Sequence, residues 1–136
     1  MNKEQLLEIV EATSEKYQTE QIKMLEKFCK VDCPSKHEEG IEICVEIILE
    51  VLNKMDVNIE RYYTKGFGSN IVATIKPQNP NGKVIVSAHI DTFSGFKIGD
   101  IQKNPFRIEN DWAYGVGISD CKAGLVSSLY SVRIMQ

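Results

Sequence analysis

The sequence lacks a long apolar run and a cluster of basic residues, and each absence excludes a class of protein. No apolar stretch among the 136 residues approaches the roughly 20 residues that a membrane-spanning helix needs. The net charge is −3, and the lysines are scattered among acidic residues, whereas nucleic-acid and anionic-membrane partners favour clustered Lys and Arg. We therefore expect no nucleic-acid partner and no membrane partner.

Cysteines are also few, and their spacing is irregular. Four of them in a chain of this length are too few for a disulfide scaffold, and no two pairs have zinc-finger spacing. The N-terminal residues are charged and helical in pattern, without the apolar block of a signal peptide. These features predict reduced thiols and a cytoplasmic protein. The cysteines are Cys29, Cys33, Cys44 and Cys121.

What the sequence does contain is typical of a soluble globular protein. Hydrophobic residues make up 43% of the chain and charged residues 26%, which is an ordinary balance. The length fits one domain of roughly 100–150 residues. We therefore predict that residues 1–136 belong to one domain.

The N-terminal segment has the spacing of an amphipathic helix. Apolar residues recur there about every three to four positions, which is the period of one helix face. A break is expected near Thr13–Ser14 or Thr19, because these residues can cap a helix. We expect the apolar face to pack in the core. It consists of Leu6, Leu7, Val10, Tyr17, Ile22, Leu25 and Phe28.

A second helix is predicted after Pro34. Ser35 and Glu38 have the spacing of a capping box, in which a serine at the N-cap and a glutamate three residues later satisfy two backbone amides. The helix is expected to run to about Met55, with one apolar face.

Short β-prone runs follow the second helix. Val57–Thr64 and Asn70–Lys76 flank a glycine-containing connection and predict a hairpin. Pro77–Gly82 is a turn cluster. Lys83–Asp91 opens with a continuous apolar run, which is typical of a strand buried on both faces.

The C-terminal part of the chain predicts two short strands and a helix. Phe106–Glu109 and Trp112–Tyr114 flank an Asn-Asp turn. Cys121–Gln136 has a helical apolar face, which includes Leu125 and Leu129.

Two of the residues that can carry chemistry lie at the end of the predicted buried strand. Ligand sites of open α/β sheets lie at this position. His89 and Asp91 are two residues apart, so on a strand they face the same side. His89 is therefore a candidate metal ligand, and Asp91 a candidate partner that fixes its ring orientation. The alternative is a hydrogen-bonded histidine at a strand end.

Asp120 is the second candidate ligand. It lies in the glycine-rich loop Gly115–Gly124, which leads into the last helix. A carboxylate held by a rigid turn suits the bridging of two cations, although an aspartate at a helix start is often only a cap.

Other readings of this loop fit less well. A dinucleotide fingerprint needs a glycine at Asp120, and a phosphate-binding Walker loop needs Ser or Thr after Lys122, where Ala123 stands. A nucleophile elbow around Ser119 needs a glycine at Cys121. Cys121 itself remains an alternative nucleophile, because a helix N-terminus lowers the pKa of a thiol.

The linked segments Val84–Thr92, Asn104–Phe106 and Ala113–Gly124 resemble, in order and spacing, one family of zinc enzymes. This is the aminoacylase, carboxypeptidase and deacylase family, which includes glutamate carboxypeptidase, acetylornithine deacetylase and succinyl-diaminopimelate desuccinylase. The stretch Asn104–Gly115 most resembles the glutamate carboxypeptidase branch. The resemblance implies an α/β fold, namely part of a three-layer catalytic domain with a mixed sheet and flanking helices.

The resemblance also implies roles for individual residues. His89 corresponds to a ligand of one zinc, Asp91 to the catalytic carboxylate that orients this histidine, and Asp120 to a ligand shared by two Zn²⁺ ions, with Co²⁺ or Mn²⁺ as alternatives. The expected substrates are peptides or N-acyl amino acids, cleaved at an amide bond by metal-activated water.

The family's Glu-Glu pair, remaining ligands and lid domain have no counterpart before Gln136. We therefore expect the sequence to be the N-terminal part of such a domain, inactive alone and prone to homo-oligomerise through exposed surfaces. The alternatives are a non-catalytic degenerate homologue and an interaction module.

Overall fold

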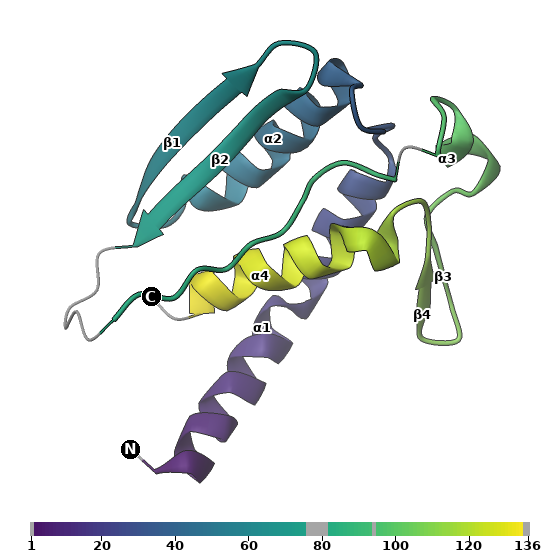
Figure 1. Cartoon of the computed structure of the whole chain (residues 1–136). Coiled ribbons are helices and arrows are strands. Elements are labelled where there is room, and N and C mark those ends of the chain that lie inside the picture. Colours follow the sequence, from purple (N-terminus) through teal and green to yellow (C-terminus); the bar gives the residue numbers. More distant parts are fainter. Residues whose placement is uncertain (1, 76–81, 94, 135–136) are drawn as a thin grey trace.

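The fold combines helices with two antiparallel strand pairs, in a computed structural model that describes residues 2–75, 82–93 and 95–134. The predicted α/β class is confirmed, but both strand pairs of the described residues are antiparallel, so the predicted mixed sheet does not form among them. Figure 1 shows the arrangement. The elements are α1 (Lys3–Cys29), α2 (Glu38–Leu52), β1 (Val57–Thr64), β2 (Gly68–Ile75), α3 (Asp100–Lys103), β3 (Arg107–Glu109), β4 (Trp112–Tyr114) and α4 (Ala123–Ile134).

Helix α1 is continuous, so the break expected near Thr13–Ser14 or Thr19 is wrong. The Thr13 hydroxyl donates to the carbonyl oxygen of Ile9, one turn earlier, at 2.6 Å. A hydroxyl bonded in this way does not cap a new helix. The helix begins instead with a capping box between Asn2 and Gln5.

Only the C-terminal half of α1 packs in the core. Met24 and Phe28 are buried there, whereas Leu6, Leu7 and Val10 are 47%, 49% and 42% exposed. The expectation of a wholly packed apolar face is therefore wrong for the first turns. Helix α4 crosses the C-terminal half of α1, and the N-terminal half of α1 projects beyond it (Figure 1).

Helix α2 begins at Glu38, and the capping box predicted for Ser35 and Glu38 does not form. Both side chains have other partners. The Ser35 hydroxyl donates to Asp91, and the Glu38 carboxylate accepts from the backbone N–H of Gly66 at 2.7 Å. Long-range contacts therefore replace the local cap.

The predicted hairpin is confirmed by β1 and β2, which pair in register from Val57↔Ile75 to Thr64↔Gly68. The hairpin packs on α2 (Figure 1). Gly66 and Gly68 have φ values of 82° and 81°, which explains the two glycines of the connection. The predicted turn at Pro77–Gly82 falls largely on residues 76–81, outside the described residues.

The segment 83–90 is extended, but it is not the buried strand that its apolar run predicts. It belongs to neither strand pair of the described residues. Val84 and Ile85 are 90% and 89% exposed. A strand buried on both faces requires paired neighbours and covering helices, and the described residues do not supply them here. The segment runs between β2 and α4 (Figure 1).

The two short strands predicted near the C-terminus are confirmed as β3 and β4. Their turn residues Asn110 and Asp111 have φ values of 49° and 65°, which is typical of a tight hairpin turn. The last helix, α4, begins at Ala123 rather than Cys121, because Asp120 and Cys121 have non-helical backbone angles. The predicted end of this helix at Gln136 lies outside the described residues.

The core lies where α1, α2 and α4 meet. The most deeply buried apolar residues of this core include Phe28, Cys33, Cys44, Val45, Leu52, Val126 and Tyr130.

No helix in the described ranges has both the length and the apolar character needed to cross a bilayer.

Candidate functional site

The site is positioned by a contact between the α1–α2 loop and the end of the extended segment. The Thr92 N–H donates to the Cys33 carbonyl oxygen at 2.8 Å, and the Ser35 N–H donates to the Thr92 carbonyl oxygen at 3.3 Å. Pro34 and Thr92 thereby form an isolated parallel bridge. These backbone bonds fix the chain directions at Asp91 and Ser35, which are far apart in sequence.

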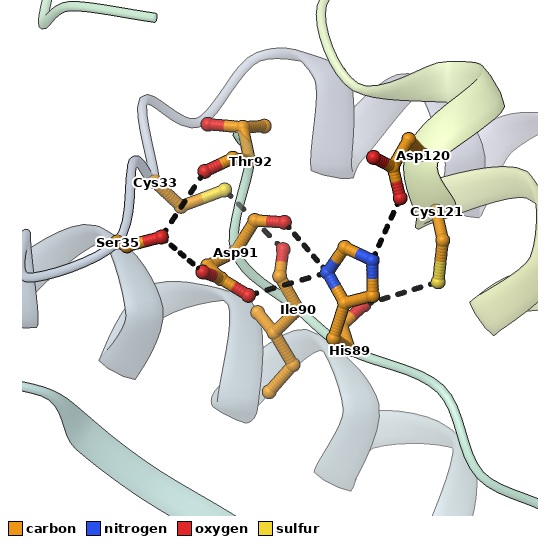
Figure 2. Close-up of polar contacts among 8 residues, drawn as sticks. All are labelled: Cys33, Ser35, His89, Ile90, Asp91, Thr92, Asp120 and Cys121. Carbon is orange, nitrogen blue, oxygen red and sulfur yellow. Dashed lines mark hydrogen bonds and ion pairs between the residues drawn. The ribbon is translucent and has the colours of Figure 1, made fainter. Parts of the chain in front are cut away.

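His89 lies between two carboxylates (Figure 2). Its Nδ1 is 3.2 Å from Asp91 Oδ1 and 3.0 Å from the Asp91 carbonyl oxygen. Its Nε2 is 2.8 Å from Asp120 Oδ1. The structure thus brings together the three residues that the sequence singled out. It does so although the segment before His89 does not form the predicted buried strand.

Asp120 is delivered by the irregular helical turn Ile118–Lys122. Gly117, just before this turn, has a φ of 77°, and a Cβ there would lie 2.6 Å from Thr92 Cγ2. Only glycine allows both this backbone conformation and the close approach. The Asp120–Cys121 peptide bond is cis. In Figure 2 the second carboxylate oxygen of Asp120 points away from His89.

Lys122 connects the same turn to the end of α1. Its side chain is fully buried, and its Nζ donates to the carbonyl oxygen of Phe28 at 2.8 Å and to that of Val31 at 3.4 Å. These carbonyls belong to the end of α1 and the loop after it, where the Phe28 oxygen also accepts from the Val31 N–H at 3.2 Å. The turn that carries Asp120 is therefore tied to α1.

The carboxylates around His89 favour its charged form. Partial burial opposes protonation, but the hydrogen bonds with Asp120 and with the Asp91 backbone, together with both negative charges, raise the pKa of His89 above its usual value. The side chains of His89, Asp91 and Asp120 are 47%, 35% and 71% exposed. The group is thus an open surface site.

A buried cysteine thiol, that of Cys33, lies next to the site. All four cysteines are free thiols. A hydrogen bond from Cys44 and the Lys122 charge, opposed by burial, lower the pKa of Cys33 to about 7. The Cys33 thiol also contacts the Ile90 carbonyl oxygen at 3.5 Å. This thiol therefore sits directly against the backbone that leads to Asp91.

The donor set fits part of a zinc site. Imidazole nitrogen and carboxylate oxygen are common zinc ligands, and a ligating histidine usually donates its other N–H to a carboxylate. His89 and Asp120 meet the first condition, and Asp91 meets the second. Among the described residues, no group of three or more His, Cys, Asp or Glu side chains is arranged to hold a metal. The described residues therefore bring together two candidate ligands.

Some residues near the site were not identified from the sequence. The capping-box spacing predicts Ser35 at a helix cap, and Lys122 stands only in a Walker-loop pattern that the sequence does not complete. A serine next to Pro34 gives no local sign of a contact with a residue 56 positions away. Cys121, the alternative nucleophile, donates to the His89 carbonyl oxygen at 3.6 Å rather than to the ring, which does not favour that role.

Comparisons with known proteins identify relatives of this chain. A profile described as Peptidase family M28 matches residues 70–136. Carboxypeptidase G2 from Pseudomonas sp. (strain RS-16) is 32% identical over 117 residues, which cover 85% of this chain and 28% of that protein. The matched residues 70–136 include both His89 and Asp120.

The chain is therefore related to the zinc-peptidase family that includes glutamate carboxypeptidase, and the relationship predicted from the motifs is confirmed. The chain spans about a quarter of the length of the carboxypeptidase that it matches, 28%. The similarity to that protein extends well beyond the three candidate residues, because it covers most of this chain.

Proposed function

We propose that the protein to which these residues belong is a zinc-dependent hydrolase of amide bonds in peptides or N-acyl amino acids. The observation that carries this proposal is the geometry at His89, whose Nε2 lies 2.8 Å from Asp120 Oδ1 while its Nδ1 faces Asp91. The relationship to a carboxypeptidase and to a peptidase family supports it.

Each residue has a defined part in the proposal. Asp91 accepts the Nδ1–H of His89 and so leaves the lone pair on Nε2 for a metal. Asp91, which the sequence analysis names as catalytic, thus acts as a positioning residue through the histidine. Asp120 contributes one oxygen beside Nε2, and its second oxygen, on an exposed side chain, is the candidate contact to a second cation.

Zinc bound at such a site supplies an acidified water and polarises the scissile carbonyl. The proposal includes two Zn²⁺ ions per site, with Co²⁺ or Mn²⁺ as substitutes. The carboxylates of Asp91 and Asp120 place two negative charges against one imidazole, which favours cation binding at this point.

The 136-residue chain is proposed to have no hydrolytic activity by itself. Catalytic zinc sites have three protein ligands and one open position, whereas the described residues bring two candidate ligands together. The general base and the other ligands would come from elsewhere in the complete protein.

The proposed location is the cytoplasm, and the proposed partners are the substrate and a second copy of the chain. The free thiols support the location, because disulfides are rare in reducing compartments. The net charge of −3 supports the absence of nucleic-acid and membrane partners.

Hydrolysis by the complete gene product, and by the 136-residue chain, tests this proposal. Each is assayed with Zn²⁺ on an N-acylated amino acid and on a peptide with a C-terminal glutamate. We expect turnover by the complete product, a loss of at least about 100-fold in kcat/KM for His89→Ala, and no turnover by the 136-residue chain. Unchanged hydrolysis by His89→Ala, or robust hydrolysis by the short chain, contradicts the proposal.

A further inference from the structure

We infer that Ser35 is a positioning residue for the metal ligand His89, acting through Asp91; this inference rests on the proposed function. The Ser35 hydroxyl donates to Asp91 Oδ2, while Asp91 Oδ1 lies 3.2 Å from His89 Nδ1. The two oxygens of one carboxylate thus have different partners on opposite sides. Figure 2 shows the row from Ser35 through Asp91 and His89 to Asp120.

The carboxylate of Asp91 needs such a restraint. Its side chain is 35% exposed, and a carboxylate with one partner can rotate about its terminal torsion, which has broad energy wells. A hydroxyl bonded to Oδ2 fixes the plane of the carboxylate and keeps Oδ1 toward the imidazole. Partners of this outer kind commonly tune the affinity of a metal ligand.

The backbone around Ser35 holds its hydroxyl in place. Ser35 donates its N–H to the Thr92 carbonyl oxygen at 3.3 Å, and Thr92 donates its N–H to the Cys33 carbonyl oxygen at 2.8 Å. The next residue, Lys36, has a φ of 75°, so the chain turns sharply before α2. The hydroxyl therefore faces Asp91 because the loop is tied to Thr92 by backbone bonds at Cys33 and at Ser35 itself.

A purely structural role makes a different prediction. The Ser35 hydroxyl also lies 3.4 Å from the Thr92 carbonyl oxygen, so it also belongs to the loop contact. If this contact were its function, removal would lower stability and leave the state of the His89 ring unchanged. Positioning predicts the converse, a change at the ring in a chain that remains folded.

The first measurement needs no metal. The tautomer of neutral His89 is read from its ring ¹⁵N shifts in the Asp120→Ala chain, so that Asp120 does not compete for the ring proton, with and without Ser35→Ala. We expect a predominantly Nδ1–H tautomer with Ser35 and a measurably smaller Nδ1–H fraction in Ser35→Ala, where the Asp91 carbonyl oxygen, 3.0 Å from Nδ1, is the remaining acceptor. His37, whose Nδ1 contacts the Asp32 carbonyl oxygen at 2.7 Å, is the internal reference because this contact does not use the Ser35 hydroxyl.

The second measurement is Zn²⁺ affinity in the chain with Asp120 intact. We expect Ser35→Ala to weaken binding by roughly tenfold, at the lower end of what outer partners contribute. Ser35→Thr, which keeps the hydroxyl, should restore both the affinity and the tautomer. Ser131→Ala, at an exposed position of α4, is the matched control and should change neither. If Ser35→Ala does not fold, Ser35→Cys replaces the strong donor by a weak one at similar volume.

The two results separate this inference from the proposed function. A folded Ser35→Ala chain with an unchanged tautomer and unchanged affinity overturns the inference, as does an Ser35→Thr chain that behaves like Ser35→Ala. If the wild-type chain binds no Zn²⁺ but Ser35→Ala changes the tautomer in the Asp120→Ala background as expected, the result contradicts the proposed metal site alone, and the positioning of His89 by Ser35 stands.

Discussion

Lys122 Nζ lies 2.8 Å from the carbonyl oxygen of Phe28, so the turn that carries Asp120 is fastened to the end of the first helix. The two residues are 94 positions apart. A fully buried ammonium is stable only when its donors are satisfied. The position of Asp120 therefore depends on a contact in the core as well as on its own loop.

Replacing Lys122 by methionine should destabilise the chain. The substitution keeps most of the side-chain volume but leaves the Phe28 and Val31 carbonyls without this donor. We expect a loss of about 1–3 kcal/mol in the free energy of unfolding, measured with urea. Lys30→Met is the control, because Lys30 is 66% exposed and exposed ion pairs contribute at most about 1 kcal/mol. Equal losses for the two variants are incompatible with the anchoring role.

Gly117→Ala should disrupt the same turn by a different mechanism. The position has a φ of 77°, and its new Cβ would lie 2.6 Å from Thr92 Cγ2. Backbone strain and overpacking together predict a loss of about 2–4 kcal/mol. Gly66→Ala is a matched control, because its φ is 82° but no heavy atom lies within 4 Å of the added Cβ. We expect about 1–2 kcal/mol for this control. Thermal unfolding that ranks Gly66→Ala equal to Gly117→Ala would refute the steric part of the explanation.

The stability of the metal-free chain should depend on pH through His89. Its pKa is raised in the folded state because, although partial burial opposes the charge, the hydrogen bond with Asp120 and both carboxylates favour it. The stabilisation is therefore fully present below the unfolded pKa of about 6.5 and is lost as pH rises through the folded pKa. The side chain is 47% exposed, so the effect should be below about 1 kcal/mol.

The check compares wild type with His89→Asn in urea unfolding at about pH 5.5 and about pH 8.5, without metal. The wild-type chain should be the more stable of the two by a larger margin at the lower pH. A stability difference between wild type and His89→Asn that grows with pH has the wrong sign for a raised histidine pKa. It contradicts the stabilisation of charged His89 by the two carboxylates.

The extended segment before His89 should promote self-association. Val84 and Ile85 are 90% and 89% exposed, and burial of such a side chain contributes about 1.5–3 kcal/mol. We expect the weight-average mass in analytical ultracentrifugation to rise with concentration. Ile85→Lys should reduce this rise, whereas Ile108→Lys, at a 51% exposed position of β3, should not. A monomer at all concentrations contradicts this prediction.

Local patterns predicted the elements whose partners are near in sequence. The β1–β2 hairpin and the Asn110–Asp111 turn follow from glycine and Asn-Asp chemistry at the connection. The exposure of residues 83–90 could not be inferred from the sequence, because an apolar run indicates a tendency to be covered and not the presence of a covering layer. The exposure of the apolar start of α1 has the same explanation.

The candidate site was predicted from order and spacing, and its supporting contacts were not. His89, Asp91 and Asp120 form one group in the structure, which the glycine-rich loop and the strand-end pair had indicated. Ser35 acts on Asp91 from a different loop, and the capping-box spacing with Glu38 offered a local explanation for it. Contacts between segments that are far apart leave no short pattern, so tertiary structure is needed to find them.

Zinc titration of the chain, followed by isothermal calorimetry in wild type, His89→Ala and Asp120→Ala, tests the central claim most directly. His89 Nε2 and Asp120 Oδ1 are 2.8 Å apart, and both belong to one proposed metal site. We expect measurable Zn²⁺ binding by wild type and a loss of at least about tenfold in each variant, because each removes one of the two proposed ligands. Binding of equal strength in all three chains would contradict it.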